Sequence, residues 1–261
     1  MFRSLHIAAT GMAAQEAQLD AISNNLANVN TVGFKKVRAD FQDLLYETLR
    51  APGSATTGTT FSPTGLQVGS GTRMVATSRL HSQGTLQQTG NPLDIAIEGN
   101  GFFPIQQSDG TIAYTRAGNF KTDAQGRIVN SEGLPLDPPI TVPPDTVSIS
   151  IGADGTVSAS SKSAPQPIQL GQIQLANFVN PAGLNSMGHN LYVATSASGE
   201  PQLGVGGVDG RGTLLQGTTE HANVEVVEEM IGLIAAQRNY EINSKVVSAA
   251  DEMLRNATQM R

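Results

Sequence analysis

The sequence predicts an α+β fold in which long N- and C-terminal helices pack together as a helical core domain and flank a central, mostly antiparallel β domain. Apolar residues recur at helical spacing through residues 1–30, and a second such stripe runs through residues 220–259. Between them, short runs alternate apolar and polar residues and are separated by Asp-Gly pairs that form tight turns. These three observations define the class of fold.

The first helix is predicted from an apolar stripe that begins at the N-terminus. The stripe repeats every seven residues at Leu5, Met12, Leu19 and Leu26, with Ala8, Ile22 and Val29 at intermediate positions. Asn, Thr and Gly cluster at 28–33, so we expect the helix to end there. Polar residues interrupt the opening apolar run, so we expect no cleaved signal peptide. On this stretch alone, an ordinary surface helix on a globular core is the favoured interpretation.

The last helix is predicted over residues 220–259, which contain no Pro and a single Gly. Its stripe comprises Val227, Ile231, Ile234, Ile242, Val246, Ala249, Met253 and Ala257. Several members recur every eleven residues, which predicts a straight or slightly right-handed stripe. A helix of this length measures about 60 Å, too long for one compact domain of this size to cover. Glu225, Glu228 and Glu229 are expected to form a solvated helix start that suits the helix dipole.

Strands and turns are predicted between the helices. Residues 46–71 are rich in Gly, Ser, Thr and Pro, so we expect an extended connector there. Val147, Ile149 and Ile151 alternate with serines, which is typical of a half-buried strand. The predicted domains are therefore 1–45 with 220–261 as a terminal-helix assembly domain, 46–71 as the connector and 72–219 as the central β domain.

Composition excludes several classes of protein. Only 15% of the residues are charged, against about 25% in typical soluble domains, so charge repulsion protects weakly against self-association. The net charge of −6 argues against a nucleic-acid partner. The chain has no Cys, which removes disulfides, thiolate nucleophiles and Cys-ligated metals. No apolar run approaches the roughly 18–20 residues of a membrane span, so we expect no membrane insertion.

A search for catalytic motifs finds none. The nucleophile-elbow, phosphate-loop and zinc-protease patterns are absent. The four histidines are His6, His81, His189 and His221, and their scatter favours surface or hydrogen-bonded structural roles over a metal site. Asp109, Asp123 and Asp154 could offer paired carboxylates for glycosidic cleavage, but each stands in a turn context that explains it. We predict no catalytic, metal-binding or cofactor-binding residues, and no cofactor.

Two classes of function remain open. The first is a self-assembling structural subunit whose terminal helices pack against neighbouring copies, giving a helical filament if the contact does not close. The second is an enzyme or ligand-binding β protein whose terminal helices pack onto its own domain. Helices that bury their stripes intramolecularly should have short connections, whereas here the first helix leads into a long flexible segment. That difference favours assembly.

Several blocks of the chain resemble the bacterial flagellar rod and hook proteins. Residues 24–35 (NNLANVNTVGFK) look like the signature near the start of those proteins. The central blocks are 99–103 (GNGFF), 114–120 (YTRAGNF) and 126–129 (GRIV), and the C-terminal blocks are 223–230 (NVEVVEEM) and 236–245 (AQRNYEINSK). Within the family, the length and the segments 63–69, 81–84 and 89–94 point to subunits of the distal rod. Hook or proximal-rod subunits are the alternatives inside the family, and a periplasmic glycan-acting enzyme is the remote one outside it.

The resemblance implies a structural subunit that assembles helically into the distal rod, transmits torque from motor to hook and encloses the export channel. It implies export without a cleaved signal peptide and a location spanning the periplasm to the outer membrane. The implied partners are copies of the chain, proximal rod proteins, the hook protein, periplasmic and outer-membrane ring proteins, and the flagellar export apparatus. The assembly interface is predicted at Leu5, Met12, Leu19, Ile22, Leu26, Val29, Val227, Ile231, Ile234, Ile242, Val246 and Met253. In the connector, Pro52, Phe61, Pro63 and Leu66 are predicted to lock neighbouring subunits.

Overall fold

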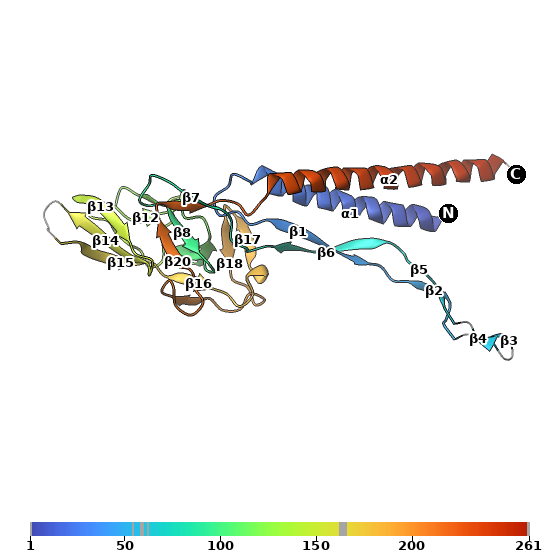
Figure 1. Cartoon of the computed structure of the whole chain (residues 1–261), viewed down its shortest axis with the longest axis horizontal. Helices are drawn as coiled ribbons and strands as arrows, with labels where there is room; N and C mark the ends of the chain where they lie inside the picture. The colour runs from blue at the N-terminus through green and yellow to red at the C-terminus, as the bar shows by residue number, and fades with distance from the viewer. Residues whose placement is uncertain (1, 54, 58–59, 62, 162–165, 260–261) are drawn as a thin grey trace. The chain divides into compact units, whose positions relative to one another are not determined.

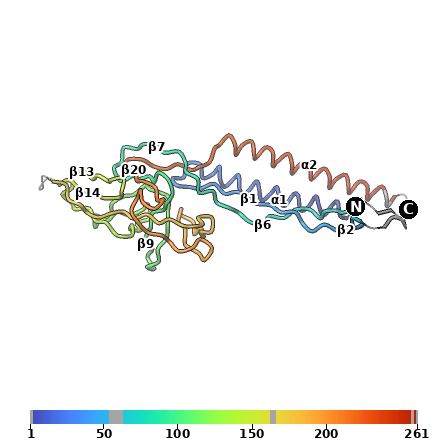
Figure 2. The backbone as a smooth tube through the Cα atoms, turned by 60° about the horizontal axis from the view of Figure 1, so that its bottom comes forward, coloured from blue at the N-terminus to red at the C-terminus, as the bar shows by residue number. Residues whose placement is uncertain are grey.

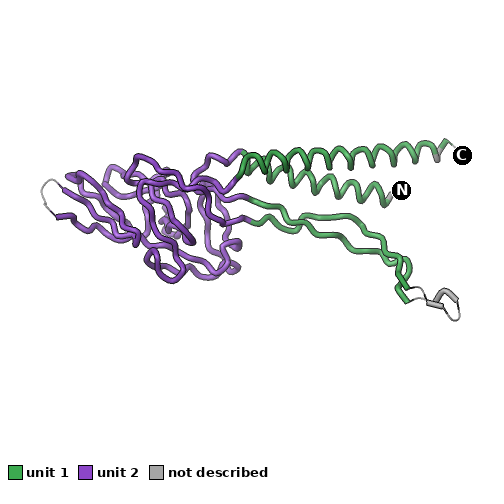
Figure 3. The backbone as a smooth tube through the Cα atoms, in the orientation of Figure 1, with its two compact units in different colours: residues 1–26, 37–78, 225–261 green, residues 27–36, 79–224 purple. Residues whose placement is uncertain are grey.

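The computed structural model describes residues 2–53, 55–57, 60–61, 63–161 and 166–259 (Figure 1). Its described residues form two α-helices, α1 (Phe2–Ala27) and α2 (Val226–Gln259), and a mostly antiparallel β region between them. The predicted α+β class is confirmed. The chain divides into two compact units, shown in green and purple in Figure 3. Unit 1 comprises 1–26, 37–78 and 225–261, and unit 2 comprises 27–36 and 79–224.

The helices begin and end where local signals allow. After α1, Thr31 N–H donates to the Asn28 carbonyl and the Phe34 N–H to the Thr31 carbonyl, so consecutive turns replace the helix as predicted. Gly33 lies there at φ +71°, a conformation that side chains with a Cβ rarely adopt. At the other end α2 begins later than predicted, because Thr218–Glu220 form strand β21, paired with β7 (Leu86–Gln88).

Unit 1 also contains a run of antiparallel strand pairs. Strand β1 (Val37–Asp43) pairs with β6 (Thr72–Arg79), and the next pair outward is β2 (Glu47–Arg50) with β5 (Leu66–Val68). Strands β3 (Ala55–Thr57) and β4 (Thr60–Phe61) form the last pair. We call residues 37–78 the β ribbon. Backbone hydrogen bonds hold the part in which the sequence predicts an extended connector, and β6 belongs to unit 1 rather than to the central β region.

Unit 2 is built from short strands in small antiparallel sheets. The largest is four-stranded, in the order β17-β18-β10-β9, and a three-stranded sheet has the order β13-β14-β15. The remaining pairs are β20 with β8, β16 with β19, β11 with β12, and β21 with β7. The strands are β8 (Ile95–Glu98), β9 (Phe103–Gln106), β10 (Ile112–Thr115), β11 (Lys121–Thr122), β12 (Ile128–Val129), β13 (Thr146–Ile151), β14 (Thr156–Ser161), β15 (Ile168–Gln172), β16 (Leu175–Asn177), β17 (Asn185–Gly188), β18 (Leu191–Val193), β19 (Gln202–Gly204) and β20 (Thr213–Gln216), with a 3-10 turn at Pro181–Gly183.

Two clusters of buried side chains form the core of unit 2. The larger one is aliphatic with two phenylalanines, Phe103 and Phe120, whose ring centroids lie 5.1 Å apart in an edge-to-face arrangement. The smaller one is aromatic and includes Phe102, Tyr114, Phe178 and Tyr192. Edge-to-face rings of this kind stabilise by about 0.5–1.5 kcal/mol beyond their buried area. Of the strand predicted from alternation at 146–151, Ile151 belongs to the larger cluster and Ile149 packs against it, whereas Val147 is 61% exposed.

A buried charged cluster ties the ends of unit 2 together. Glu220 accepts hydrogen bonds from Lys35 Nζ at 2.7 Å, from Arg116 Nε at 2.6 Å and from the Gly84 N–H at 2.8 Å. All three charged side chains are at most 4% exposed. Burial alone raises the pKa of Glu220, but Arg116 and Lys35 together hold that pKa below its ordinary value. Composition and spacing gave no sign of this cluster, whose members lie up to 185 residues apart.

Candidate assembly interface

The helices α1 and α2 run antiparallel along one another, as Figure 2 also shows. Asn25 Nδ2 donates to Glu229 Oε2 at 3.2 Å. Three residues back along α1 and three forward along α2, a Cβ on Gly232 would lie 3.3 Å from Ile22 Cδ1. Eleven further residues along each helix, a Cβ on Gly11 would lie 2.9 Å from Asn243 Nδ2. The three contacts share one register, so the pairing is regular along its length.

The fully buried positions of the two helices are mostly small or polar. Fully buried on the two helices, among the side chains that the structure describes, are Ala8, Ala14, Ile22, Asn25, Glu229, Ala236 and Ala250. Ile22 is the one large apolar side chain in that set. The expectation of a solvated acidic helix start is wrong for Glu229, which is 4% exposed and bonded to Asn25, although Glu225 and Glu228 are exposed.

The apolar stripe of α2 lies on a different face and is exposed. Its members are between 43% and 63% exposed: Val227, Ile231, Ile234, Ile242, Val246 and Met253. We call these six residues the outer stripe. A shallow groove over Ile231, Ile234 and Ile242 is mostly apolar, with Arg238 and Asn239 at its border. Met230, which the sequence pattern did not include, is also 52% exposed. Monomeric soluble proteins rarely leave a continuous apolar face of this kind uncovered.

The sequence-predicted residues of α1 are less open. Leu5, Met12, Leu19 and Leu26 are half-buried, and Ile22 is buried against Gly232 of α2. Val29 lies beyond the end of α1 and belongs to unit 2, so it does not continue the helical stripe. The structure therefore brings Ile22 to the intramolecular helix contact and leaves the outer stripe of α2 as the open apolar face.

The β ribbon presents a second set of exposed side chains. Pro52, Pro63 and Leu66 are exposed, whereas the side chain of Phe61 lies outside the part of the chain that the structure describes. Further exposed apolar residues that the sequence reasoning missed are Phe41, Leu45, Tyr46 and Leu49. The apolar run at 44–46 was the available signal, but it stands next to a Gly-, Ser- and Thr-rich stretch that dominates the local composition.

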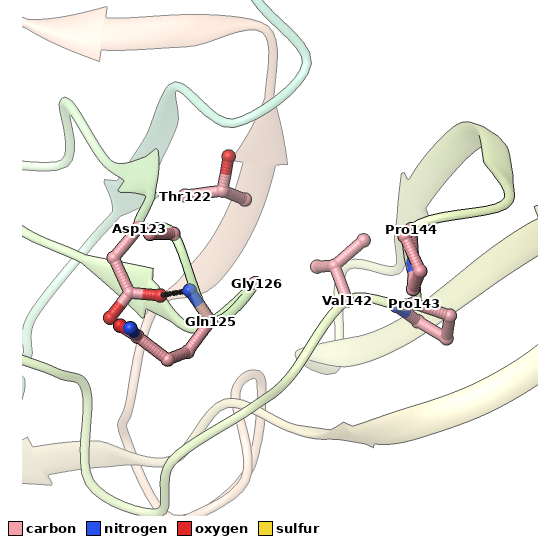
Figure 4. Close-up of a pocket in the computed structure, with 8 residues that line it drawn as sticks. Thr122, Asp123, Gln125, Gly126, Val142, Pro143 and Pro144 are labelled. Carbon is pink, nitrogen blue, oxygen red and sulfur yellow. Dashed lines mark hydrogen bonds between the residues drawn. The ribbon is translucent and has the colours of Figure 1, made fainter.

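The aspartates considered for glycosidic chemistry serve turns. Figure 4 shows Asp123 at a pocket with Val142 and Pro143, its carboxylate accepting from the Gln125 N–H at 2.9 Å. The Asp109 and Asp154 carboxylates accept in the same way from Thr111 and Thr156. Hydrogen bonds from those threonines lower the pKa of both carboxyls. A glycosidase acid needs a raised pKa, so these carboxylates are suited to turns and not to proton donation.

The histidines do not gather into a site. His189 pairs with Glu132 and His221 with Gln87, which agrees with hydrogen-bonded surface roles. His81 departs from that expectation, because its ring packs edge-on against Phe102 and Tyr192 with centroids 5.4 Å and 5.6 Å away. Burial lowers the pKa of His81 to about 4, helped by the nearby cations. Within the described residues, no three His, Asp or Glu side chains are placed to share a metal ion.

Three family models match the chain along its length. Residues 5–35 match the flagella basal body rod protein model, 96–159 the flagellar hook protein FlgE/F/G D1 domain, and 215–260 the flagellar basal body rod FlgEFG protein C-terminal model. These matches cover most of α1, the strands from β9 to β13 in unit 2, and all of α2. They define the class as the structural rod and hook proteins of the bacterial flagellum.

Relatives narrow the class. The chain is 47% identical to the flagellar basal-body rod protein FlgG of Buchnera aphidicola subsp. Schizaphis graminum, over the whole of both chains. It is 49% identical to FlgG of Caulobacter vibrioides over 99% of each chain, and 46% identical to FlgG of Borreliella burgdorferi over 100% of this chain and 99% of the relative. The chain belongs to the flagellar basal-body rod protein family. It is a structural protein of that family and not an enzyme.

No helix in the described part of the chain is both long enough and apolar enough to cross a lipid bilayer.

Proposed function

We propose that this chain is a subunit of the distal rod, which copies of it build by helical self-assembly around the export channel. The observation that carries the proposal is the outer stripe of α2, six large apolar side chains that are about half exposed within one chain. The full-length similarity to basal-body rod proteins supports the same assignment.

The outer stripe supplies a driving force for association. Fully burying one such side chain stabilises by about 1.5–3 kcal/mol, so covering the exposed half of six contributes on the order of 6 kcal/mol per subunit. A second copy of the chain is the proposed occupant, because a repeated contact with a neighbour builds a filament when its rotation does not close. Together with the half-buried Leu5, Met12, Leu19 and Leu26 of α1, the stripe forms the proposed assembly interface. Ile22 is buried against α2 and Val29 belongs to unit 2, so neither is assigned to this surface.

The β ribbon is the proposed lock between neighbours. Pro52, Pro63 and Leu66 are exposed, and Leu45 in the same ribbon is 90% exposed. Side chains as open as these gain the most when a neighbouring subunit covers them. We assign Phe61 to the same lock from its place in the sequence. A ribbon fixed to a neighbour would oppose bending. A shaft that transmits torque from motor to hook requires this stiffness.

The remaining partners follow from a place in the rod. They are the proximal rod proteins, the hook protein, the periplasmic and outer-membrane ring proteins and the flagellar export apparatus. The proposed location spans the periplasm to the outer membrane, reached by flagellar export without a cleaved signal peptide. The low content of charge suits a shaft that turns inside ring proteins, because fewer fixed ion pairs oppose rotation.

Electron cryo-tomography of cells that lack this gene tests the proposal. Motor rings with a short proximal stub, a shaft that stops within the periplasm and no hook are the expected result. A complete rod with an absent or altered hook would assign the chain to the hook, and loss of the whole rod would assign it to the proximal rod. Normal flagella would overturn the proposed function altogether.

A further inference from the structure

The fully buried part of the contact between α1 and α2 is small or polar apart from Ile22. Leu233 and Val247 of α2 lie half-buried beside it, four residues after Glu229 and Asn243. Each helix carries a richer face: α1 has its leucine repeat, which includes Leu19 and Leu26, and α2 has the outer stripe. Joining those two faces within one chain is the alternative pairing, and it would leave no open stripe for a neighbour. The small and polar groups at the actual contact therefore bear on which of the two pairings the chain adopts.

Asn25 lies where it can favour one rotation of α2 over another. Its side chain is 1% exposed and is held by the first residue of β1, since Oδ1 accepts from the Val37 N–H at 2.8 Å and Nδ2 donates to the Val37 carbonyl at 2.9 Å. The same Nδ2 donates to Glu229 Oε2 at 3.2 Å. The backbone thus fixes the amide, and the amide fixes the carboxylate of α2.

The cost of disturbing this bond is what makes it selective. Glu229 is 4% exposed, and a carboxylate that deep requires hydrogen bonds. Rotating α2 to turn its outer stripe toward α1 would take Glu229 away from Asn25. It would leave the Asn25 amide, which is 1% exposed, without that bond. In coiled helices, a single buried Asn fixes register in this way, at a cost in stability.

Two glycines make the register specific along the helices. Glycine in a helix interior is unfavourable by about 0.5–1 kcal/mol relative to alanine, yet α1 has Gly11 and α2 has Gly232. Each faces a larger side chain of the other helix, Asn243 and Ile22 respectively, at distances that leave little or no room for a Cβ. Both close contacts between a glycine and the facing side chain exist in one register only. Sliding either helix along its axis, or rotating it, would lose them.

We propose that the Asn25–Glu229 pair determines the rotation of α2 about its own axis and so keeps the outer stripe available to a second copy of the chain. This inference rests on the proposed self-assembly for its consequence, but the rotation itself belongs to the single subunit. Asn25 is a positioning residue: it acts on the interface through Glu229 and α2.

The rotation can be read by disulfide trapping, because the natural chain has no Cys. Seven residues before Asn25 on α1 is Gln18, and seven residues after Glu229 on α2 is Ala236. The register of the antiparallel pair therefore places Gln18 opposite Ala236. We expect the full-length variant with Gln18→Cys and Ala236→Cys to form an intramolecular disulfide. The matched control combines Gln18→Cys with Ala235→Cys, an exposed alanine beside the outer stripe, and should cross-link much less. Equal cross-linking of both pairs would overturn the assigned rotation, whatever the protein assembles into.

Replacing Asn25 then tests the selection. In the two cysteine backgrounds, Asn25→Leu should shift the ratio of the 18–236 to the 18–235 disulfide by about tenfold or more toward 18–235, the effect expected for loss of a buried hydrogen bond to a charged group. Asn24→Leu is the control, because Asn24 is the exposed neighbour of the same type. Glu229→Gln should keep the 18–236 disulfide, since its amide oxygen still accepts from Asn25.

Assembly provides the second readout. In cells, Asn25→Leu without added cysteines should fail to restore rods, although the chain is produced and unit 2 folds, whereas Asn24→Leu should restore them. An unchanged disulfide ratio in Asn25→Leu would overturn the selective role. A shifted ratio with normal rods would show that the rotation does not govern assembly. If the wild-type chain builds no rod but the ratio shifts as expected, only the proposed function fails.

Discussion

Ile242→Asp separates the stability of one chain from the stability of the polymer. Ile242 is 57% exposed in the single chain, so the free energy of unfolding of the free subunit should change by no more than about 0.5 kcal/mol. In the proposed polymer the same side chain is covered by a neighbour. There the substitution loses about 1 kcal/mol of apolar burial and places an unpaired carboxylate in the contact, which costs several kcal/mol more. A combined loss of about 4 kcal/mol weakens association about 1,000-fold.

The assay is complementation of a deletion strain followed by electron microscopy of isolated basal bodies, with urea unfolding of the purified subunit in parallel. We expect no rod beyond the proximal stub and an unchanged unfolding midpoint. Ser244→Asp is the control, since it adds the same charge to an exposed position outside the outer stripe. Normal rods from Ile242→Asp would refute the reasoning, and so would rods equally absent from Ser244→Asp.

Three further predictions concern unit 2 and the β ribbon. Burial lowers the pKa of His81 to about 4, so as the pH falls below 6.5 the unfolded chain binds a proton that the folded chain does not. This linkage should lower the free energy of unfolding by about 3 kcal/mol between pH 6.5 and 4. Equilibrium unfolding across that range measures it, and His81→Gln should remove this contribution to the slope. Glu220→Gln leaves two buried cations without their carboxylate and should lower the free energy of unfolding by about 3–5 kcal/mol, measured by urea unfolding; a loss below 1 kcal/mol would contradict the role of the charged cluster. Deleting 46–65 should give a curved or hook-like polymer in electron micrographs, and a straight rod would contradict the locking role of the β ribbon.

The elements that could be predicted from the sequence are those whose apolar residues recur at regular spacing. The outer stripe was visible because Ile231, Ile234 and Ile242 recur at helical spacing, and the strand at 146–151 because its apolar residues alternate with serines. Both patterns concern which residues share a face. Neither says which face a partner covers, and for α1 the intramolecular contact proved to run through Ile22 and polar or small neighbours beside the leucine repeat.

What periodicity could not predict is held by polar groups and by backbone. Asn25 and Glu229 form a hydrogen bond 204 residues apart, and polar residues at helical spacing resemble an ordinary solvated face. The charged cluster around Glu220 depends on a similar long-range encounter. The β ribbon escaped prediction because its outer pairs are joined by main-chain hydrogen bonds, which leave no mark on a Gly-, Ser- and Thr-rich composition.

Unit 1 is built from three separate segments of the sequence, which limits the order in which it can fold when the chain emerges from one end to the other. Its segments come from the start, the middle and the end of the sequence, so neither terminus alone can complete it. A chain threaded through a narrow conduit therefore closes its helix pair only after the final segment has emerged. Unit 2 faces a similar wait, since Lys35 meets Glu220 late in the sequence. A product truncated before α2 lacks both Glu229 and the outer stripe. It therefore cannot complete unit 1, and under the proposed interface it cannot join a growing rod through that stripe.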